Sequence, residues 1–211
     1  MNVFSLGAAG LLLLSFTATA QVRLGVIGSG QLANQKYTVN AYSTNGNAKI
    51  GFRAGIMLDA PVADRLSIQA QLVYSTKGTK LNEANTGLSA TETTLAFNYL
   101  ELPLQLTYGF SAGTGRVVVG AGPYVGYALN GKITDNAGGQ TTSESLEFGS
   151  GADQSKRLDV GLYLSAGYEL ASGPLLAIHY APGLYNMANS SAGSIRNNTI
   201  GLSIGFLFGG K

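Results

Sequence analysis

Cysteine is absent from the 211-residue sequence, which excludes disulfide bonds, zinc–thiolate sites and thiol nucleophiles. Charged residues are also scarce, because they make up 11% of the chain against roughly 25% in ordinary soluble domains. The net charge of +2 is small, and no basic cluster accompanies it. We therefore expect no nucleic-acid partner.

Long apolar runs are missing as well. Outside the N-terminus, no run approaches the ~20 apolar residues that a membrane-spanning helix needs. Nevertheless, 45% of the residues are hydrophobic and the mean hydropathy is +0.16. A chain that is apolar overall, but never in one long block, is typical of β-strands that alternate apolar and polar residues.

The N-terminus carries one short apolar block, from Leu6 to Phe16. Thr17-Ala18-Thr19-Ala20 follows it with the small-x-small pattern of a signal-peptidase site. We expect residues 1–20 to form a signal peptide and residues 21–211 to form one β-barrel domain. No Lys or Arg precedes the apolar block, so a single N-terminal anchor helix is the alternative.

The stretch 98–108 shows the alternation most clearly. One set of alternate residues is apolar and the other is mostly polar: Leu100, Leu102, Leu104, Leu106 and Tyr108 against Tyr99, Glu101, Pro103, Gln105 and Thr107. A period of two predicts a β-strand with one apolar face. Soluble sandwiches and transmembrane barrels both use such strands, so the rest of the chain decides between them.

Eight segments of this kind alternate with long polar segments and short turns. We expect strands at 22–30, 49–58, 65–75, 95–108, 116–129, 157–170, 174–181 and 196–208. The long polar segments are 31–47, 76–93, 130–156 and 182–194. Outer-membrane barrels have an even number of strands, long extracellular loops and short periplasmic turns. The sequence thus predicts an all-β fold: an eight-stranded antiparallel transmembrane β-barrel, an up-and-down meander with both mature termini in the periplasm.

Charged residues fall on the faces that we assign to the lumen, and none falls on the outward faces. The absence of charge from the outward faces is expected in lipid, because a Lys or Arg near the membrane midplane costs ~2–4 kcal/mol. Five inward residues form a candidate structural network: Arg53, Glu101, Asp159, Glu169 and His179. Buried charges must be paired, and an eight-stranded barrel is just wide enough for side chains to fill. We expect a plugged lumen, with a narrow water path as the alternative.

Outward aromatic residues gather near the strand ends. On the long-loop side they are Tyr74, Tyr127 and Tyr180, and on the short-turn side they are Tyr108, Tyr168, Phe206 and Phe208. Two such girdles are typical of the two membrane interfaces.

Two prolines interrupt neighbouring strands. Pro103 and Pro123 cannot donate hydrogen bonds to a strand ladder. A hairpin across residues 109–115 places them near each other. We expect a local bulge or a gap in the ladder there.

Three motifs resemble those of a known family. They are Asn98-Tyr99-Leu100-Glu101-Leu102-Pro103-Leu104, Gly120-Ala121-Gly122-Pro123-Tyr124-Val125-Gly126-Tyr127 and Asp159-Val160-Gly161-Leu162. The mature chain resembles the PorT-like outer-membrane β-barrel family of Bacteroidota over essentially its whole length. The resemblance implies an eight-stranded barrel in the outer membrane, and it admits an accessory role in protein secretion. The end Gly209-Gly210-Lys211 departs from the terminal aromatic residue that the barrel-assembly machinery recognises.

Sites of chemistry are hard to find in this sequence. His179, the only histidine, could be a catalytic base, but no outward serine or acid stands beside it for lipid chemistry. Residues 25–30 are glycine-rich but lack the Lys-Ser/Thr of a nucleotide loop. Asp135 and Asp153 are too sparse for a calcium loop. We predict no catalytic, cofactor or metal site.

The sequence therefore predicts a small, monomeric, non-enzymatic protein of the cell outer membrane. Its expected partners are outer-membrane lipid, the barrel-assembly machinery, and a protein or ligand at four surface loops. A soluble secreted calyx for a small hydrophobic ligand is one alternative, and it requires an apolar lumen. A lipid-modifying enzyme that uses His179 is the other.

Overall fold

The computed structural model describes residues 22–39, 42–82, 91–151, 154–189 and 193–209, so the expected signal peptide lies outside the described residues. The described residues form ten strands. They are β1 (Arg23–Val39), β2 (Tyr42–Asn45), β3 (Asn47–Ala63), β4 (Leu66–Leu81), β5 (Thr91–Ala112), β6 (Gly115–Ala137), β7 (Gln140–Ser145), β8 (Leu158–Leu170), β9 (Pro174–Pro182) and β10 (Gly193–Leu207).

These strands close into a barrel. The order along the sheet is β10-β9-β8-β6-β5-β4-β3-β1, and β10 pairs with β1 over Gly25↔Leu207 to Val39↔Gly193. Each neighbouring pair is antiparallel. β2 and β7 each pair with a single barrel strand, which leaves eight of the ten strands in the barrel wall. The predicted eight-stranded up-and-down barrel is confirmed. Among the described residues, no helix has the length and apolar character to cross a membrane.

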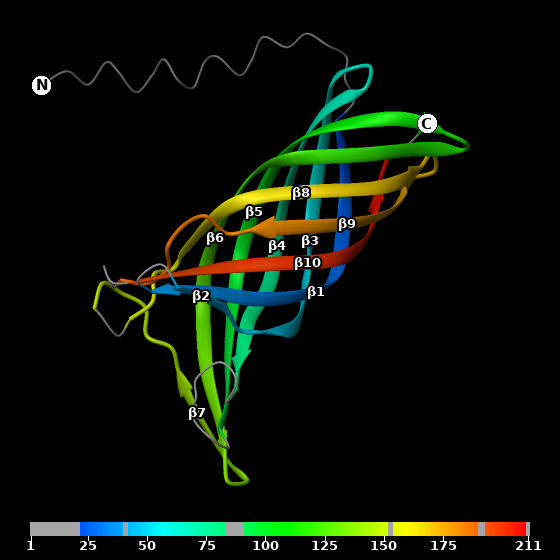
Figure 1. The fold of residues 1–211 in the computed structure, drawn as a ribbon. Helices are drawn as coiled ribbons and strands as arrows, with labels where there is room; N and C mark the ends of the chain where they lie inside the picture. The colour runs from blue at the N-terminus through cyan, green and yellow to red at the C-terminus, as the bar shows by residue number, and fades with distance from the viewer. Residues whose placement is uncertain (1–21, 40–41, 83–90, 152–153, 190–192, 210–211) are drawn as a thin grey trace, which may run out of the picture.

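Three of the predicted loops are wrong in large part. β1, β4 and β6 run well into the polar segments 31–47, 76–93 and 130–156, β5 begins inside the second of these segments, and β2 and β7 lie wholly within the first and the third. Figure 1 shows β5, β6 and β7 continuing far beyond the ends of the neighbouring strands. The alternation signal fails there because, beyond the apolar part of the barrel, a strand has no face that must be apolar. Gly138 and Gly139, with φ of 58° and 82°, form the tight turn of the β6–β7 hairpin.

The outer face of the barrel carries an apolar belt. One member from each barrel strand illustrates it, with exposures between 40% and 66%: Leu32, Ile56, Leu72, Leu104, Val125, Leu164, Ile178 and Ile204. On β5 the belt runs from Leu100 to Tyr108, which is roughly 20 Å for a tilted strand. Beyond it, outward residues such as Asn130 and Lys132 are polar and exposed. The soluble calyx is therefore wrong, because it requires the apolar face to point inward.

The ladder around the two prolines is interrupted as expected. Pairing of β5 with β6 stops after Pro103↔Tyr124 and resumes at Leu106↔Ala121 without a change of register. The feature is thus a gap and not a bulge. The β5–β6 bulge lies elsewhere, at the register shift between Asn98 and Tyr99.

Lipid contact can be tested with two arginine substitutions on the outer face of β6. Val125→Arg places a charge in the belt, and we expect a loss of ~2–4 kcal/mol in the free energy of unfolding, measured by urea titration in lipid vesicles. Asn136→Arg places the same side chain on exposed strand beyond the belt. The second substitution should change the free energy of unfolding by no more than about 0.5 kcal/mol. Equal effects of the two substitutions would contradict the assignment of the belt.

Candidate functional site

The lumen contains two separate groups of ionised side chains. The central cluster comprises Arg53, Lys77, Glu101 and Asp159, at the level of the apolar belt. The basal cluster comprises Arg23, Asp59, Arg116 and Glu169, at the short-turn end. The sequence predicts one network, but the structure places Glu169 in the basal cluster, apart from Glu101 and Asp159.

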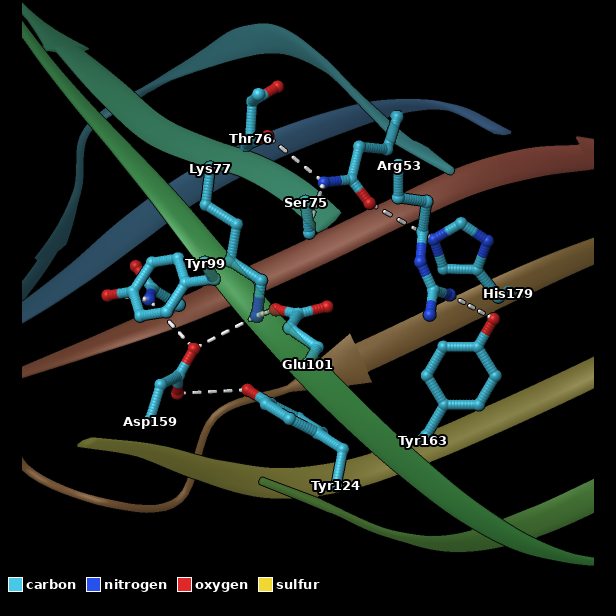
Figure 2. A network of polar contacts seen from close by, with 12 residues as sticks. Arg53, Ser75, Thr76, Lys77, Tyr99, Glu101, Tyr124, Asp159, Tyr163 and His179 are labelled. Atoms are coloured by element: carbon cyan, nitrogen blue, oxygen red, sulfur yellow. Dashed lines mark hydrogen bonds and ion pairs between the residues drawn. The ribbon is translucent and has the colours of Figure 1, made fainter. Parts of the chain in front are cut away.

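Lys77 is the centre of the first cluster (Figure 2). Its Nζ lies 2.5 Å from Glu101 Oε1 on β5 and 2.9 Å from Asp159 Oδ2 on β8. Tyr124 Oη donates to Asp159 Oδ1 at 3.0 Å, and Asn197 Nδ2 donates to Asp159 Oδ2 at 2.9 Å. The Lys77 ammonium also lies 4.5 Å from the centre of the Tyr124 ring, a cation–π contact. This single cation therefore links β4 to strands on other walls of the barrel.

Lys77 is absent from the predicted network because it lies in the segment 76–93, which the sequence pattern predicts to be a loop. The signal was present in the sequence. Val73 and Ser75 are inward on β4, and Lys77 continues the same alternation. Its side chain is 1% exposed.

Arg53 occupies the same level through different contacts. Its guanidinium donates to Tyr163 Oη, donates to Gln71 Oε1 at 3.2 Å and lies 4.7 Å from the centre of the Tyr163 ring. The His179 ring also stacks on the Tyr163 ring, with 5.4 Å between the two ring centroids. Figure 2 shows the three side chains side by side.

The basal cluster is a chain of arginine–carboxylate pairs. Arg23 Nη2 lies 2.6 Å from Asp59 Oδ2, and Arg23 also pairs with Glu169. Arg116 Nη2 lies 2.8 Å from Glu169 Oε2 and 3.6 Å from Asp59 Oδ2. Each cluster contains two cations and two anions, so each is electrically neutral. That balance suits charges held away from water.

The polar side chains leave little free space in the lumen. A cavity of about 20 Å³ lies against Gln71, Tyr163 and Ser203, which is room for about one water molecule. A wider vestibule of about 680 Å³ opens at the short-turn end beside Arg23 and Arg116. At the other end Met187 is 2% exposed and accepts a hydrogen bond from Tyr99 Oη at 3.3 Å. Within the part of the chain that the structure describes, the lumen is closed at the central cluster.

His179 has a serine beside it, but the arrangement does not suit lipid chemistry. Its Nδ1 lies 3.1 Å from Ser203 Oγ, and its Nε2 lies 3.4 Å from Gln31 Oε1. A hydrolytic triad would place a carboxylate where Gln31 stands. Ser203 is 1% exposed and His179 is 2% exposed, both inside the lumen. No group of three or more metal-binding side chains occurs among the described residues.

The aromatic residues expected at the membrane interfaces lie on the outer face. Tyr74, Tyr127, Tyr180, Phe206 and Phe208 are exposed, whereas Tyr108 and Tyr168 are half-buried. Tyr168 Oη donates to Ala112 O at 2.7 Å. Phe110, which is not among the predicted interface residues, packs edge-on against Tyr108 with 4.8 Å between the ring centroids. The interfacial role of these rings stays a prediction.

An apolar outer belt around a closed barrel with a polar, charge-paired lumen defines a transmembrane β-barrel. Residues 17–189 match the family described as outer membrane protein beta-barrel domain. The chain belongs to this family, and it is a small β-barrel of the outer membrane.

Solved structures of other barrels align with most of the chain at low identity. Ail, the attachment invasion locus protein of Yersinia pestis, is 14% identical, with a TM-score of 0.42 over 88% of this chain and 99% of Ail. Neisserial surface protein A is 14% identical, with a TM-score of 0.43 over 87% of this chain and 96% of that protein. The N-terminal β-barrel domain of Pseudomonas aeruginosa OprF is 14% identical, with a TM-score of 0.34 over 89% and 100%. No curated protein sequence matches the chain.

The central cluster makes a prediction about stability. Lys77→Met removes one cation from two buried carboxylates, and we expect a loss of about 3–5 kcal/mol in the free energy of unfolding. The matched change Lys80→Met lies on β4 like Lys77, and it breaks the exposed ion pair of Lys80 with Glu92 on β5. It should lower the free energy of unfolding by no more than about 1 kcal/mol. Adding Asp159→Asn to Lys77→Met should recover part of the loss. Urea titrations in detergent measure all three, and equal costs for Lys77 and Lys80 would contradict the interpretation.

Proposed function

We propose that this protein is a non-enzymatic, non-conducting, PorT-like barrel that binds an extended polypeptide at its long-loop end. The observation that carries the proposal is the projecting sheet formed by the ends of β5 and β6 together with β7. This sheet continues past the apolar belt and ends in an edge strand with all six residues exposed.

A closed lumen favours binding over transport. Lys77, Glu101 and Asp159 are buried and paired across it, and moving a solute past them would separate these charges. The burial of Ser203 and His179 supports a role without catalysis, because both side chains lie in the lumen whereas lipid contacts the outer face. A lipid-modifying enzyme is therefore the weaker proposal.

In the part of the chain that the structure describes, β7 pairs with β6 alone, so its outer edge can accept another strand. Leu146 N donates to Gly131 O, and donors alternate along an antiparallel pair. It follows that the N–H groups of Thr141 and Ser143 point away from β6. Unpaired strand edges add extended peptides through main-chain hydrogen bonds. Glu144 on this strand and Asp135 and Glu147 nearby favour a basic segment.

The same reasoning fits an accessory role in protein secretion, because a polypeptide in transit is extended. We further propose that the long loops face the cell exterior and that both ends of the barrel domain face the periplasm after removal of residues 1–20. Gly25 on β1 pairs with Leu207 on β10, so the two ends of the described domain lie at the same end of the barrel. Closure leaves no open edge in the belt, which supports a monomer.

A displayed library of linear peptides, selected on the folded barrel in detergent, tests this function. We expect enriched peptides to be rich in Lys and Arg. Ser143→Pro removes a free-edge N–H without removing a bond to β6, and it should weaken their binding about tenfold or more. Ser143→Ala removes the side chain alone and should bind like the wild type. No enrichment, or equal binding by the proline variant, would overturn the proposal.

A further inference from the structure

A graded column of side chains lies on the outer face where β1 pairs with β10. Leu32 is opposite Ile200, Asn34 is opposite Asn198, and Lys36 is opposite Arg196. Going from the belt toward the long loops, the column therefore changes from apolar to amide to cationic. This corrects the expectation that the outer faces carry no charge, because Arg196 and Lys36 are outward and exposed, just beyond the belt.

A groove runs along the lower part of this column. Its volume is about 360 Å³, and its lining includes Leu32, Asn34, Asn45, Tyr180, Asn198 and Ile200. Tyr180 on β9 is opposite Ile200 and is 45% exposed. The apolar floor of the groove is thus continuous with the apolar belt, while its upper rim is made of amides.

Within the described residues, the cationic pair at the top has no acidic partner. Like charges directly opposite each other on neighbouring strands repel. Neither Lys36 nor Arg196 takes part in any of the ion pairs among the described residues. The sequence has no Asp or Glu between residues 22 and 58, or between 170 and 211. An anion from outside the chain would relieve this repulsion.

We propose that this column binds an acylated lipid whose headgroup carries phosphate. The acyl chains lie in the groove against Leu32 and Ile200, the amides contact headgroup oxygens, and a phosphate lies between Lys36 and Arg196. A phosphorylated lipid presents apolar, polar and anionic parts in the same order as the column. From Leu32 to Lys36 the tilted strand rises roughly 10 Å, comparable with the interfacial layer of about 5–8 Å in one leaflet.

The inference rests on the proposed orientation, which puts the column in the outer leaflet. A protein partner is less suited to it, because the lower half of the column belongs to the belt that lipid covers. The opposite wall carries mixed charge, since Glu92, Asp135 and Glu144 lie on β5, β6 and β7 together with Lys132 on β6.

Native mass spectrometry of the folded barrel in detergent tests the proposal, with lipid A bearing two phosphates as the probe. We expect bound lipid A on the wild type and binding about tenfold weaker or more for the double variant Lys36→Gln/Arg196→Gln. Lys132→Gln removes an exposed outward cation beyond the belt on β6 and should leave binding unchanged. Dephosphorylated lipid A should bind as weakly as lipid A binds the double variant. Inorganic phosphate should not compete at equal concentration.

Several outcomes would overturn the inference. The double variant could bind lipid A as tightly as the wild type, or Lys132→Gln could weaken binding as much as the double variant does. Either result would mean that diffuse charge attraction, and not this column, holds the lipid. Competition by free phosphate would mean an anion site that needs no lipid. Ile200→Asn, which alters the apolar half alone, should also weaken binding, and unchanged binding would contradict the groove. Heat-modifiable gel migration verifies that each variant is folded. Ser143→Pro should bind lipid A normally, so failure of peptide binding is distinguishable from failure of lipid binding.

Discussion

The ammonium group of Lys77 is the interaction on which the interior of this barrel depends. It reaches two carboxylates from different strands, 2.5 Å from Glu101 and 2.9 Å from Asp159. Without it, two anions would lie together in a space from which water is almost excluded, and such a state is strongly unfavourable. With it, the cluster is neutral, the rings of Tyr99 and Tyr124 pack against the cation, and the lumen closes. The side chains that stabilise the barrel are thus the ones that fill the lumen at this level.

Closure at this level separates the molecule into parts with different surroundings. The belt contacts hydrocarbon and determines where the barrel lies in the membrane. The projecting sheet of β5, β6 and β7 lies beyond the belt, and among the described residues β7 has one partner strand. Charge differs around the long-loop end. Acids outnumber the exposed cation Lys132 on β6 and β7, whereas Lys36 and Arg196 on β1 and β10 have no acidic partner among the described residues. One wall is thereby suited to a polypeptide and the other to an anionic lipid.

The period of two was sufficient to predict the barrel, its strand order and the inward direction of Arg53, Glu101, Asp159, Glu169 and His179. The period of two is informative within the belt because lipid on one side requires apolar residues and the packed lumen on the other side holds polar ones. Beyond the belt that constraint ends, so β7, the last part of β4 and the ends of β5 and β6 have the pattern of loops, and the prediction omits Lys77 with the last part of β4. The partners of each charge were also beyond prediction. Whether Glu169 meets Arg23 or Lys77 depends on the register of distant strands around the barrel.

Electrical recording from the purified barrel in a planar lipid bilayer tests the central claim most directly. The lumen described here has no continuous path past Lys77, Glu101 and Asp159, so we predict that the inserted wild-type protein gives no ion-conducting steps in concentrated potassium chloride. Replacing all three residues by alanine removes the ion pairs and should produce measurable conductance. Steady ohmic conductance of the wild-type barrel would contradict the claim that paired charges close the lumen.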